Sequence, residues 1–408
     1  MIGATIKDCC TMKIATGRGN IELIVVVAII SISAIVSLPG LAISPILSNL
    51  DTIFPRASTL EVELLESLPS LMIIPAMLLS GRWSIRGHKM RLLVVGCAIF
   101  LLSGIGCILS RTLTELIITS SLVGIGAGVV IPLSTGIIVD YFSGKPRIKM
   151  LGISSAVNNL TLVIATFAVG YLADIEWHLA FVVYLLPAAT LLLIPTISHT
   201  PPQSPETEDR ERCSEGLNRG VLCRLMLFYF AITYCSLVVT YNTSYIATDN
   251  HLASNASGSI IALFFLAIML PGFALNKIMS TVGKWTNMWS LMTMGVGLII
   301  MSLPHPSEIT LLIGALLTGL GYGVMQPIIY AKTAANAPPH LATLALSIVM
   351  AVNYLTIVVA PFMIDGIDRL FSTTSYSFAF MANGIVTIAI GVVAIFRAPH
   401  DRVLGSDE

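Results

Sequence analysis

Long apolar stretches recur along this chain, and they constrain its fold more than any other feature. A helix that crosses a bilayer needs about 20 apolar residues, and twelve stretches of the sequence are candidates. They lie near residues 22–48, 59–80, 91–109, 113–139, 150–173, 177–195, 221–246, 257–276, 285–303, 308–331, 341–364 and 375–396. Only 11% of the residues are charged, against about 25% in soluble domains. A soluble protein so poor in charge could not cover its surface, so the sequence predicts an all-α membrane protein with twelve transmembrane helices.

Basic residues are distributed unevenly among the connections between these stretches. If the N terminus is cytoplasmic and every stretch spans, Arg56, Arg111 and Arg369 fall outside and the other 19 of the 22 Lys and Arg residues fall inside. Cytoplasmic connections carry an excess of Lys and Arg. We therefore expect a multi-pass protein of the cytoplasmic (inner) membrane with both termini in the cytoplasm.

One connection near the middle of the chain is unlike the others. It contains the run PPQSPETEDRERCSEGLNRG, which is polar, charged and rich in proline, as linkers are. The sequence therefore predicts a cytoplasmic tail over 1–20, a six-helix bundle over 21–195, a cytoplasmic linker over 196–220, a second six-helix bundle over 221–398 and a tail over 399–408.

Two segments of the chain are nearly identical in pattern. LVGIGAGVVIP (122–132) and LTGLGYGVMQP (317–327) place their glycines and proline at the same spacing, 195 residues apart. SAVNNL (155–160) and MAVNYL (350–355) keep the same offset. A parallel internal repeat is typical of transporters whose halves are related by an axis along the membrane normal. Because small residues let membrane helices approach closely, we expect the glycines to serve packing; a nucleotide site would need a preceding strand.

Several functional classes are disfavoured by composition and motifs. The net charge is zero, so there is no electrostatic footprint for nucleic acid. The seven cysteines form no CxxC pair and have no histidine at zinc spacing, so no metal site is expected. No GxxxxGK[ST] run occurs, which argues against ATP as the driving force. We expect no cofactor and no enzymatic activity; the expected partners are a small molecule, protons and the lipid bilayer, and nothing in the chain demands a dimer, so we expect a monomer.

With these features the chain resembles the major facilitator superfamily over residues 20–398. The GIGAG run followed by DYF, and YLADIEWHLAF (171–181), are similar to bacterial efflux members. The loop GRWSIRGHKMR resembles the family's signature of a Gly, three residues and Asp-Arg, but Ile85 stands in the Asp position. The resemblance implies that Arg86, near Gly81, pairs with Asp140 and latches the halves in one state. The alternative is an ordinary basic cytoplasmic loop.

Two departures weaken a multidrug-antiporter interpretation. Many proton-driven members carry an Arg just before the glycine run, where this chain has Ser120. Drug antiporters carry a Gly-Pro signature in helix 5, and the matching stretch NNLTLVIATFAVG lacks it.

Two acidic residues are candidates for proton coupling. Glu63 and Glu66 are three residues apart on the second apolar stretch, so they share a helix face. Ionisable groups inside a membrane are functional candidates by default, and burial favours the neutral form of a carboxyl group. Glu66, about 10 Å along the helix, is the expected proton carrier. The alternative is a helix that begins later, with both glutamates among the headgroups.

Amides and tyrosines are the candidates for substrate binding. An unpaired amide in hydrocarbon is costly, so the asparagines of the repeated segment should face the interior, for binding or for hydrogen bonds between helices. The resemblance implies that helices 1, 4, 7 and 10 line a central cavity, and aromatic surfaces with amides suit a neutral or amphipathic molecule. Tyr245 and Tyr330 are expected instead at the membrane interface. The expected substrate-binding residues are Asn158, Asn159, Tyr234, Tyr241, Asn242, Tyr322, Gln326, Asn353 and Tyr354.

These observations predict a secondary transporter that works by alternating access, with proton-coupled efflux of a small organic molecule as the first hypothesis. Proton-coupled uptake of a neutral nutrient such as a sugar is the second hypothesis, and a non-transporting membrane receptor is the third. Because no deeply placed Arg or Lys is evident, phosphate esters and dicarboxylates are disfavoured as substrates.

Overall fold

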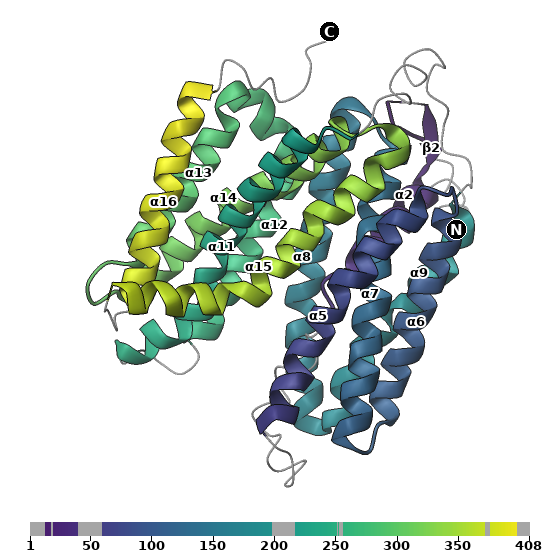
Figure 1. Cartoon of the computed structure of the whole chain (residues 1–408), viewed down its shortest axis with the longest axis horizontal. Coiled ribbons are helices and arrows are strands. Elements are labelled where there is room, and N and C mark those ends of the chain that lie inside the picture. The colour runs from purple at the N-terminus through teal and green to yellow at the C-terminus, as the bar shows by residue number, and fades with distance from the viewer. Residues whose placement is uncertain are drawn as a thin grey trace, which may run out of the picture.

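The protein is described by a computed structural model that covers residues 13–17, 19–39, 59–197, 217–250, 252, 256–371 and 376–397. Figure 1 shows two groups of helices that lie side by side at the top of the view and diverge toward the bottom. The first group contains α2 (Leu23–Ala34), α5 (Thr59–Ser84), α6 (Lys89–Leu109), α7 (Leu113–Tyr141), α8 (Gly144–Ile175) and α9 (Leu186–Leu193), the last flanked by the 3-10 helices η1 (Trp177–Leu185) and η2 (Ile194–Thr196). The second contains α11 (Arg219–Asp249), α12 (Ala256–Val282), α13 (Thr286–Met301), α14 (Glu308–Ala335), α15 (Ala342–Leu370) and α16 (Tyr376–Arg397); the turns η3 (Gly283–Trp285) and η4 (Pro339–Leu341) precede α13 and α15.

The helices have the length and composition of membrane spans. Nine helical stretches of the described residues are long and apolar enough to cross a bilayer, and one of them, Ala256–Met301, contains both α12 and α13. Large apolar side chains such as Leu192 and Phe362 are 80% and 76% exposed, which suits contact with lipid rather than water. The predicted helical multi-pass membrane fold is confirmed, whereas the count of twelve spans stays a prediction.

Strands were not expected, yet a short hairpin precedes the first helix. β1 (Lys13–Ala15) and β2 (Asn20–Glu22) pair antiparallel, with Lys13 opposite Glu22. The backbone N–H of Ser143, between α7 and α8, donates to the Thr16 carbonyl at 2.9 Å. Part of the predicted N-terminal tail is therefore attached to the first group of helices.

The repeated glycine segment performs the same packing task in both groups. In α7, a Cβ on Gly128 would lie 2.6 Å from the Ile73 carbonyl of α5, and one on Gly126 would lie 2.6 Å from the Phe100 nitrogen of α6. In α14, a Cβ on Gly319 would lie 2.6 Å from the Phe264 carbonyl of α12, while Gly321 faces α13 in the same way. Each copy therefore lets one central helix touch the backbones of two neighbours, and a side chain at these positions would force them apart.

Nearly all the positively charged side chains that the structure describes lie at one end of the helices. This "basic end" is where α5, α7, α12 and α14 finish and α6, α8, α11, α13 and α15 begin. Among the described Lys and Arg side chains, Arg111 and Arg369 are the two at the opposite end.

The two groups of helices touch directly at the basic end. Gly81 of α5 packs against Ser347 of α15, and a Cβ on Gly136 of α7 would lie 2.6 Å from the Thr343 Oγ1 of α15. Deeper, a Cβ on Gly152 of α8 would lie 2.5 Å from the Gly272 carbonyl of α12. A small apolar cluster continues the contact, formed by Val139 of the first group with Ala334, Ala337, Ala342, Ala345 and Leu346 of the second. Without side chains at the glycines, the backbones come close enough to close this end.

Candidate functional site

A hydrogen-bonded cluster lies where α14 contacts both α8 and α11. The Ser155 hydroxyl of α8 donates to the Gln326 Oε1 of α14 at 3.1 Å. The Gln326 Nε2 lies 3.4 Å from the hydroxyls of both Tyr229 and Tyr330. These two hydroxyls are 2.7 Å apart, and their rings meet edge to face at 5.7 Å between centroids. The four side chains are uncharged, and the cluster connects the two groups of helices.

The cluster lies well inside the helices. Ser155 and Gln326 are each roughly 15 Å along their helices from the basic end, at 1.5 Å per residue. The polar first turns of α8, GKPRIK, and Lys332 in the last turn of α14 lie nearer the basic end, so the cluster falls within the apolar part of both helices. Polar groups at that depth need protein partners, and the four residues of the cluster supply them to one another.

The two neighbouring asparagines of α8 have different surroundings. Asn159 is buried, and its Nδ2 donates to the Ser155 carbonyl at 2.8 Å. The Asn158 Oδ1 is buried and has no hydrogen-bond partner among the described residues. A buried acceptor without a partner costs free energy, so Asn158 is the member of this pair with a group left for a ligand. On α15, the repeat-equivalent Asn353 is half-buried, and Tyr354 packs against a buried apolar cluster with members from both groups.

The other expected binding residues have partners within the second group. The Tyr322 hydroxyl lies 3.4 Å from the Thr233 Oγ1. The Tyr241 hydroxyl donates to the Ile357 carbonyl of α15 at 3.0 Å. Tyr234 is buried and interacts with neighbouring groups. The buried Asn242 has an Nδ2 without a hydrogen-bond partner among the described residues. The structure therefore brings Gln326 to the boundary between the groups and leaves Tyr241 bonded to a neighbouring helix.

The two tyrosines expected at the membrane interface, Tyr245 and Tyr330, have different surroundings in the structure. Tyr245 is 55% exposed and stacks on Tyr376 with 4.8 Å between ring centroids. Tyr330 instead packs against two buried apolar clusters and bonds to Tyr229, so its interfacial placement was wrong. Its position four residues after Gln326, on the same helix face, was the available signal. Tyr229 and Ser155 were not selected from the sequence, because a single hydroxyl in an apolar stretch does not show which neighbour it faces.

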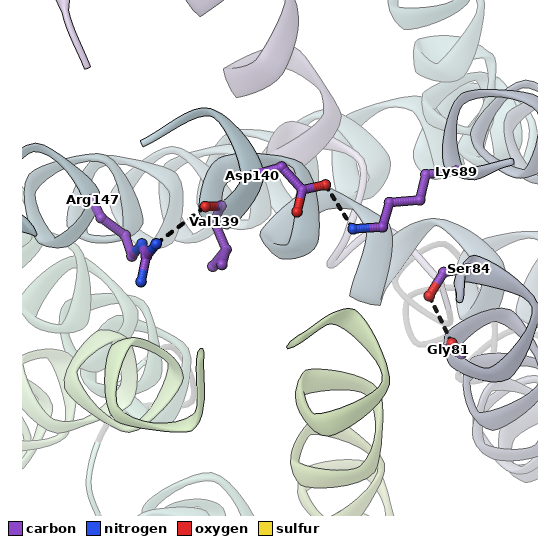
Figure 2. A network of polar contacts seen from close by, with 6 residues as sticks. All are labelled: Gly81, Ser84, Lys89, Val139, Asp140 and Arg147. Atoms are coloured by element: carbon purple, nitrogen blue, oxygen red, sulfur yellow. Dashed lines mark hydrogen bonds and ion pairs between the residues drawn. The ribbon is translucent and has the colours of Figure 1, made fainter. Parts of the chain in front are cut away.

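Asp140 has an ion-pair partner that the sequence analysis did not select, while the latch of Gly81, Arg86 and Asp140 stays a prediction. Lys89 Nζ lies 2.7 Å from Asp140 Oδ2, with the two side chains 18% and 21% exposed, and Figure 2 shows the contact. Lys89 begins α6, which packs against α7, whereas Arg86 is exposed in the turn after α5. The Lys89–Asp140 ion pair therefore connects two helices of the same group. Nearby, the Arg147 Nη2 donates to the Val139 carbonyl at 3.3 Å, and the Ser84 hydroxyl donates to the Gly81 carbonyl at 2.6 Å (Figure 2).

For the two candidate proton carriers, the structure gives the helix on which they lie but not the position of their side chains. Glu63 and Glu66 are on α5, and their side chains lie outside the described residues. Their role stays a prediction.

Comparison with known proteins points to one family of membrane transport proteins. The family model for the Major Facilitator Superfamily matches residues 23–243 and 223–407. The chain is 36% identical to the multidrug transporter protein MdtP of Bacillus subtilis (strain 168) over 93 residues, which is 22% of this chain and 17% of that protein. It is 28% identical to the multidrug resistance protein MdtL of Shigella flexneri serotype 5b (strain 8401) over 178 residues, 41% of this chain and 44% of that protein. The matches thus span less than half the length of these curated relatives.

Solved structures show the same fold at low sequence identity. The proton:xylose symporter XylE bound to 6-bromo-6-deoxy-D-glucose superposes with a TM-score of 0.74 at 14% identity, over 93% of this chain and 95% of that one. The human organic anion transporter MFSD10 superposes with a TM-score of 0.67 at 15% identity, over 92% of this chain and 97% of that one. The resemblance seen in the sequence is confirmed: the chain belongs to the Major Facilitator Superfamily.

Proposed function

We propose that this chain is a secondary active transporter that exports a small, uncharged or amphipathic organic molecule in exchange for protons. The observation that carries the proposal is the uncharged cluster of Ser155, Gln326, Tyr229 and Tyr330, which joins the two groups of helices within the apolar part of α8 and α14. Amide and phenol groups on an otherwise apolar wall bind neutral molecules that carry hydrogen-bonding groups. Efflux is favoured over uptake because the names of the curated relatives describe multidrug transport and resistance.

The proposed arrangement in the membrane follows from the charge distribution. The basic end faces the cytoplasm, because Lys and Arg are retained on that side, and both termini lie there. The two six-helix bundles, 21–195 and 221–398, rock against each other about the central cluster, as halves of repeat transporters do. The protein acts as a monomer in the cytoplasmic membrane.

The proposed substrate contacts centre on a few amides. Asn158 offers a buried acceptor that lacks a partner among the described residues, so a substrate with a hydroxyl or N–H group would satisfy it. Gln326 and Tyr354 supply further polar and aromatic surface from the second group. Tyr241 and Tyr322 support the wall of the site through their bonds to α15 and to Thr233.

Glu66 is the proposed proton carrier, because a carboxyl group within a transmembrane helix exchanges its proton as its access to water changes. The test uses inside-out membrane vesicles with an imposed proton gradient and a pH-sensitive dye. A panel of neutral and amphipathic compounds is added to wild type, Glu66→Gln and the matched control Glu63→Gln. Collapse of the gradient by a compound in wild type and Glu63→Gln, and its loss in Glu66→Gln, is the expected result. Equal collapse in all three variants would refute Glu66 as the carrier, and no collapse with any compound would refute proton-coupled export.

Uptake of a neutral sugar is the second candidate, and the fold shared with a proton:xylose symporter favours it. The two directions are separated by vesicle orientation. Radiolabelled D-xylose accumulating in right-side-out vesicles, with no response to any compound in inside-out vesicles, would replace export by uptake. Binding without flux in either orientation would indicate the third hypothesis, a membrane receptor.

A further inference from the structure

Neutral hydrogen bonds join the two groups of helices. The Lys89–Asp140 pair lies within the first group, and the Arg369–Asp365 pair, with its charges four residues apart, lies within α15. In the part of the chain that the structure describes, two hydrogen bonds between uncharged groups connect the two groups of helices. One is the Ser155–Gln326 bond at 3.1 Å, and the other joins the Asn276 Nδ2 of α12 to the Lys145 carbonyl of α8 at 3.2 Å. Both of these neutral hydrogen bonds are placed to hold the two groups together.

The Ser155–Gln326 bond is also a departure from the internal repeat. With the offset of 195 residues, the equivalents of Ser155 and Gln326 are Met350 and Ile131, which cannot form a hydrogen bond. α8 contacts α14 and α15 contacts α7, so the fold contains two equivalent crossings, and only one carries the polar pair. The apolar pair at the other crossing indicates that packing does not require the hydrogen bond.

The surrounding residues hold Gln326 in the orientation that meets Ser155. Its Oε1 accepts from Ser155, while its Nε2 is held between the hydroxyls of Tyr229 and Tyr330. Both tyrosines belong to the second group of helices. Gln326 is therefore held by its own group and reaches the first group through its bond to Ser155.

We propose that the Ser155–Gln326 bond is a polar contact that favours the closed form of the basic end, and that it breaks each time this end opens during transport. The proposal rests on the proposed alternating access of the two bundles. When the bundles separate at this level, Ser155 on α8 moves away from Gln326 on α14, and the Gln326 Oε1 becomes an available acceptor within the apolar part of α14. Gln326 and Ser155 are positioning residues in this role, because they set the balance between the two forms.

A second buried group, the hydroxyl of Thr343, disfavours the closed form of the basic end. The Thr343 Oγ1 of α15 is buried against Gly136 of α7 and has no hydrogen-bond partner among the described residues. The closed form thus leaves a hydroxyl unsatisfied, which disfavours closure. Replacing this hydroxyl by a methyl group should favour the closed form, whereas removing the Ser155 hydroxyl should favour the open form.

Distances between the two bundles test the proposal directly. Spin labels are attached at His88→Cys and Lys284→Cys, which are exposed positions at the basic end of the first and second group, in full-length protein whose native cysteines are replaced. Double electron–electron resonance then measures the distance distribution in lipid nanodiscs without added substrate. Ser155→Ala should raise the ratio of open to closed molecules about three- to tenfold, the range for loss of one neutral hydrogen bond. Thr343→Val should lower that ratio.

Ser154→Ala is the matched control for this measurement. The Ser154 hydroxyl lies 2.7 Å from the Ser33 Oγ of α2, within the first group, so its removal should leave the ratio unchanged. Raising KCl from 0.1 to 1 M should not open the wild type, because the bond is uncharged. Equal distributions for Ser155→Ala and wild type, equal shifts for Ser155→Ala and Ser154→Ala, or opening by salt would each overturn the proposal. Because no substrate is present, a failure of the vesicle assay and a failure of this measurement are independent results.

Discussion

Asn158 and Asn159 are neighbours in sequence with different tasks. The Asn159 amide bonds to its own helix one turn earlier, at the Ser155 carbonyl. The Asn158 Oδ1 has no partner among the described residues. The sequence predicted that both would face the interior, because amides avoid hydrocarbon. Which of them has a group left for a ligand depends on how α8 is rotated against its neighbours, and the one-dimensional pattern does not contain that rotation.

Asn158→Leu should therefore preserve stability and lose transport. Leucine fills a similar volume and removes an unsatisfied acceptor, so the midpoint of unfolding in detergent should stay unchanged or rise. Loss of one substrate hydrogen bond should lower transport of a responsive compound about tenfold, which corresponds to about 1.4 kcal/mol. The Asn159→Leu control should instead lose about 1 kcal/mol of stability. Unchanged transport by Asn158→Leu would show that Asn158 does not contact substrate.

The Lys89–Asp140 pair gives a second prediction about single side chains. Both side chains are mostly buried, so the charge-assisted bond should contribute about 1–2 kcal/mol. A double-mutant cycle with Lys89→Gln and Asp140→Asn should yield a coupling energy of that size from SDS-induced unfolding. The matched cycle with Arg86→Gln and Asp140→Asn should give a coupling near zero. A larger coupling for Arg86 would support the partner predicted from the sequence.

α15 contains a proline that leaves one backbone carbonyl without its partner in the helix. A side chain of another helix donates a hydrogen bond to this carbonyl. Pro361 has no N–H, so the carbonyl of Ile357, four residues earlier, loses its partner within the helix. The Tyr241 hydroxyl of α11 donates to this carbonyl at 3.0 Å. Sequence reasoning placed Tyr241 among the substrate-binding residues, and that role stays a prediction. An aromatic hydroxyl in an apolar helix looks the same in either role, so the sequence did not show the bond to Ile357.

Tyr241→Phe should thus destabilise the protein, and the effect should depend on Pro361. Leaving the Ile357 carbonyl unpaired inside the membrane should cost about 1–3 kcal/mol in SDS-induced unfolding. In a Pro361→Ala background the helix regains its own N–H at this position, so the same change should cost less than about 1 kcal/mol. Equal costs in the two backgrounds would contradict the assigned role of Tyr241.

The central helices α7 and α14 depend on the absence of side chains at their glycines. Gly128→Ala places a Cβ 2.6 Å from the Ile73 carbonyl, and because backbone cannot yield easily, we expect a loss of about 1–3 kcal/mol. Gly170→Ala on α8 is the matched control, since a Cβ there meets nothing within 4 Å. The control should be neutral or slightly stabilising, because alanine favours helix over glycine. A tolerated Gly128→Ala would contradict the close approach of α5 and α7.

The sequence predicts the overall architecture more completely than it predicts the contacts between side chains. Apolar length predicts α14 over 308–331, and the helix covers Glu308–Ala335. α8 begins at Gly144 rather than near 150, because its polar first turns, GKPRIK, do not register as apolar. The repeat predicts equivalent packing of α7 and α14, and the glycine contacts agree. The partner of Asp140, the burial of Tyr330 and the Ser155–Gln326 bond depend on helix rotation, so sequence reasoning missed them. The domain boundaries fall largely in 198–216, outside the described residues, and they stay predictions.

Solute counterflow in proteoliposomes tests most directly whether this chain carries a small neutral molecule between two membrane faces. Purified protein is reconstituted in liposomes loaded with excess unlabelled compound, and uptake of a radiolabelled trace is followed. The panel contains D-xylose, chloramphenicol as a neutral molecule with hydroxyl and amide donors, and compounds that respond in the vesicle assay. Transient accumulation of at least one compound by wild type, with an initial rate about tenfold lower in Asn158→Leu and preserved in Asn159→Leu, is the predicted result. No accumulation of any compound above that of protein-free liposomes would contradict the proposed transport function.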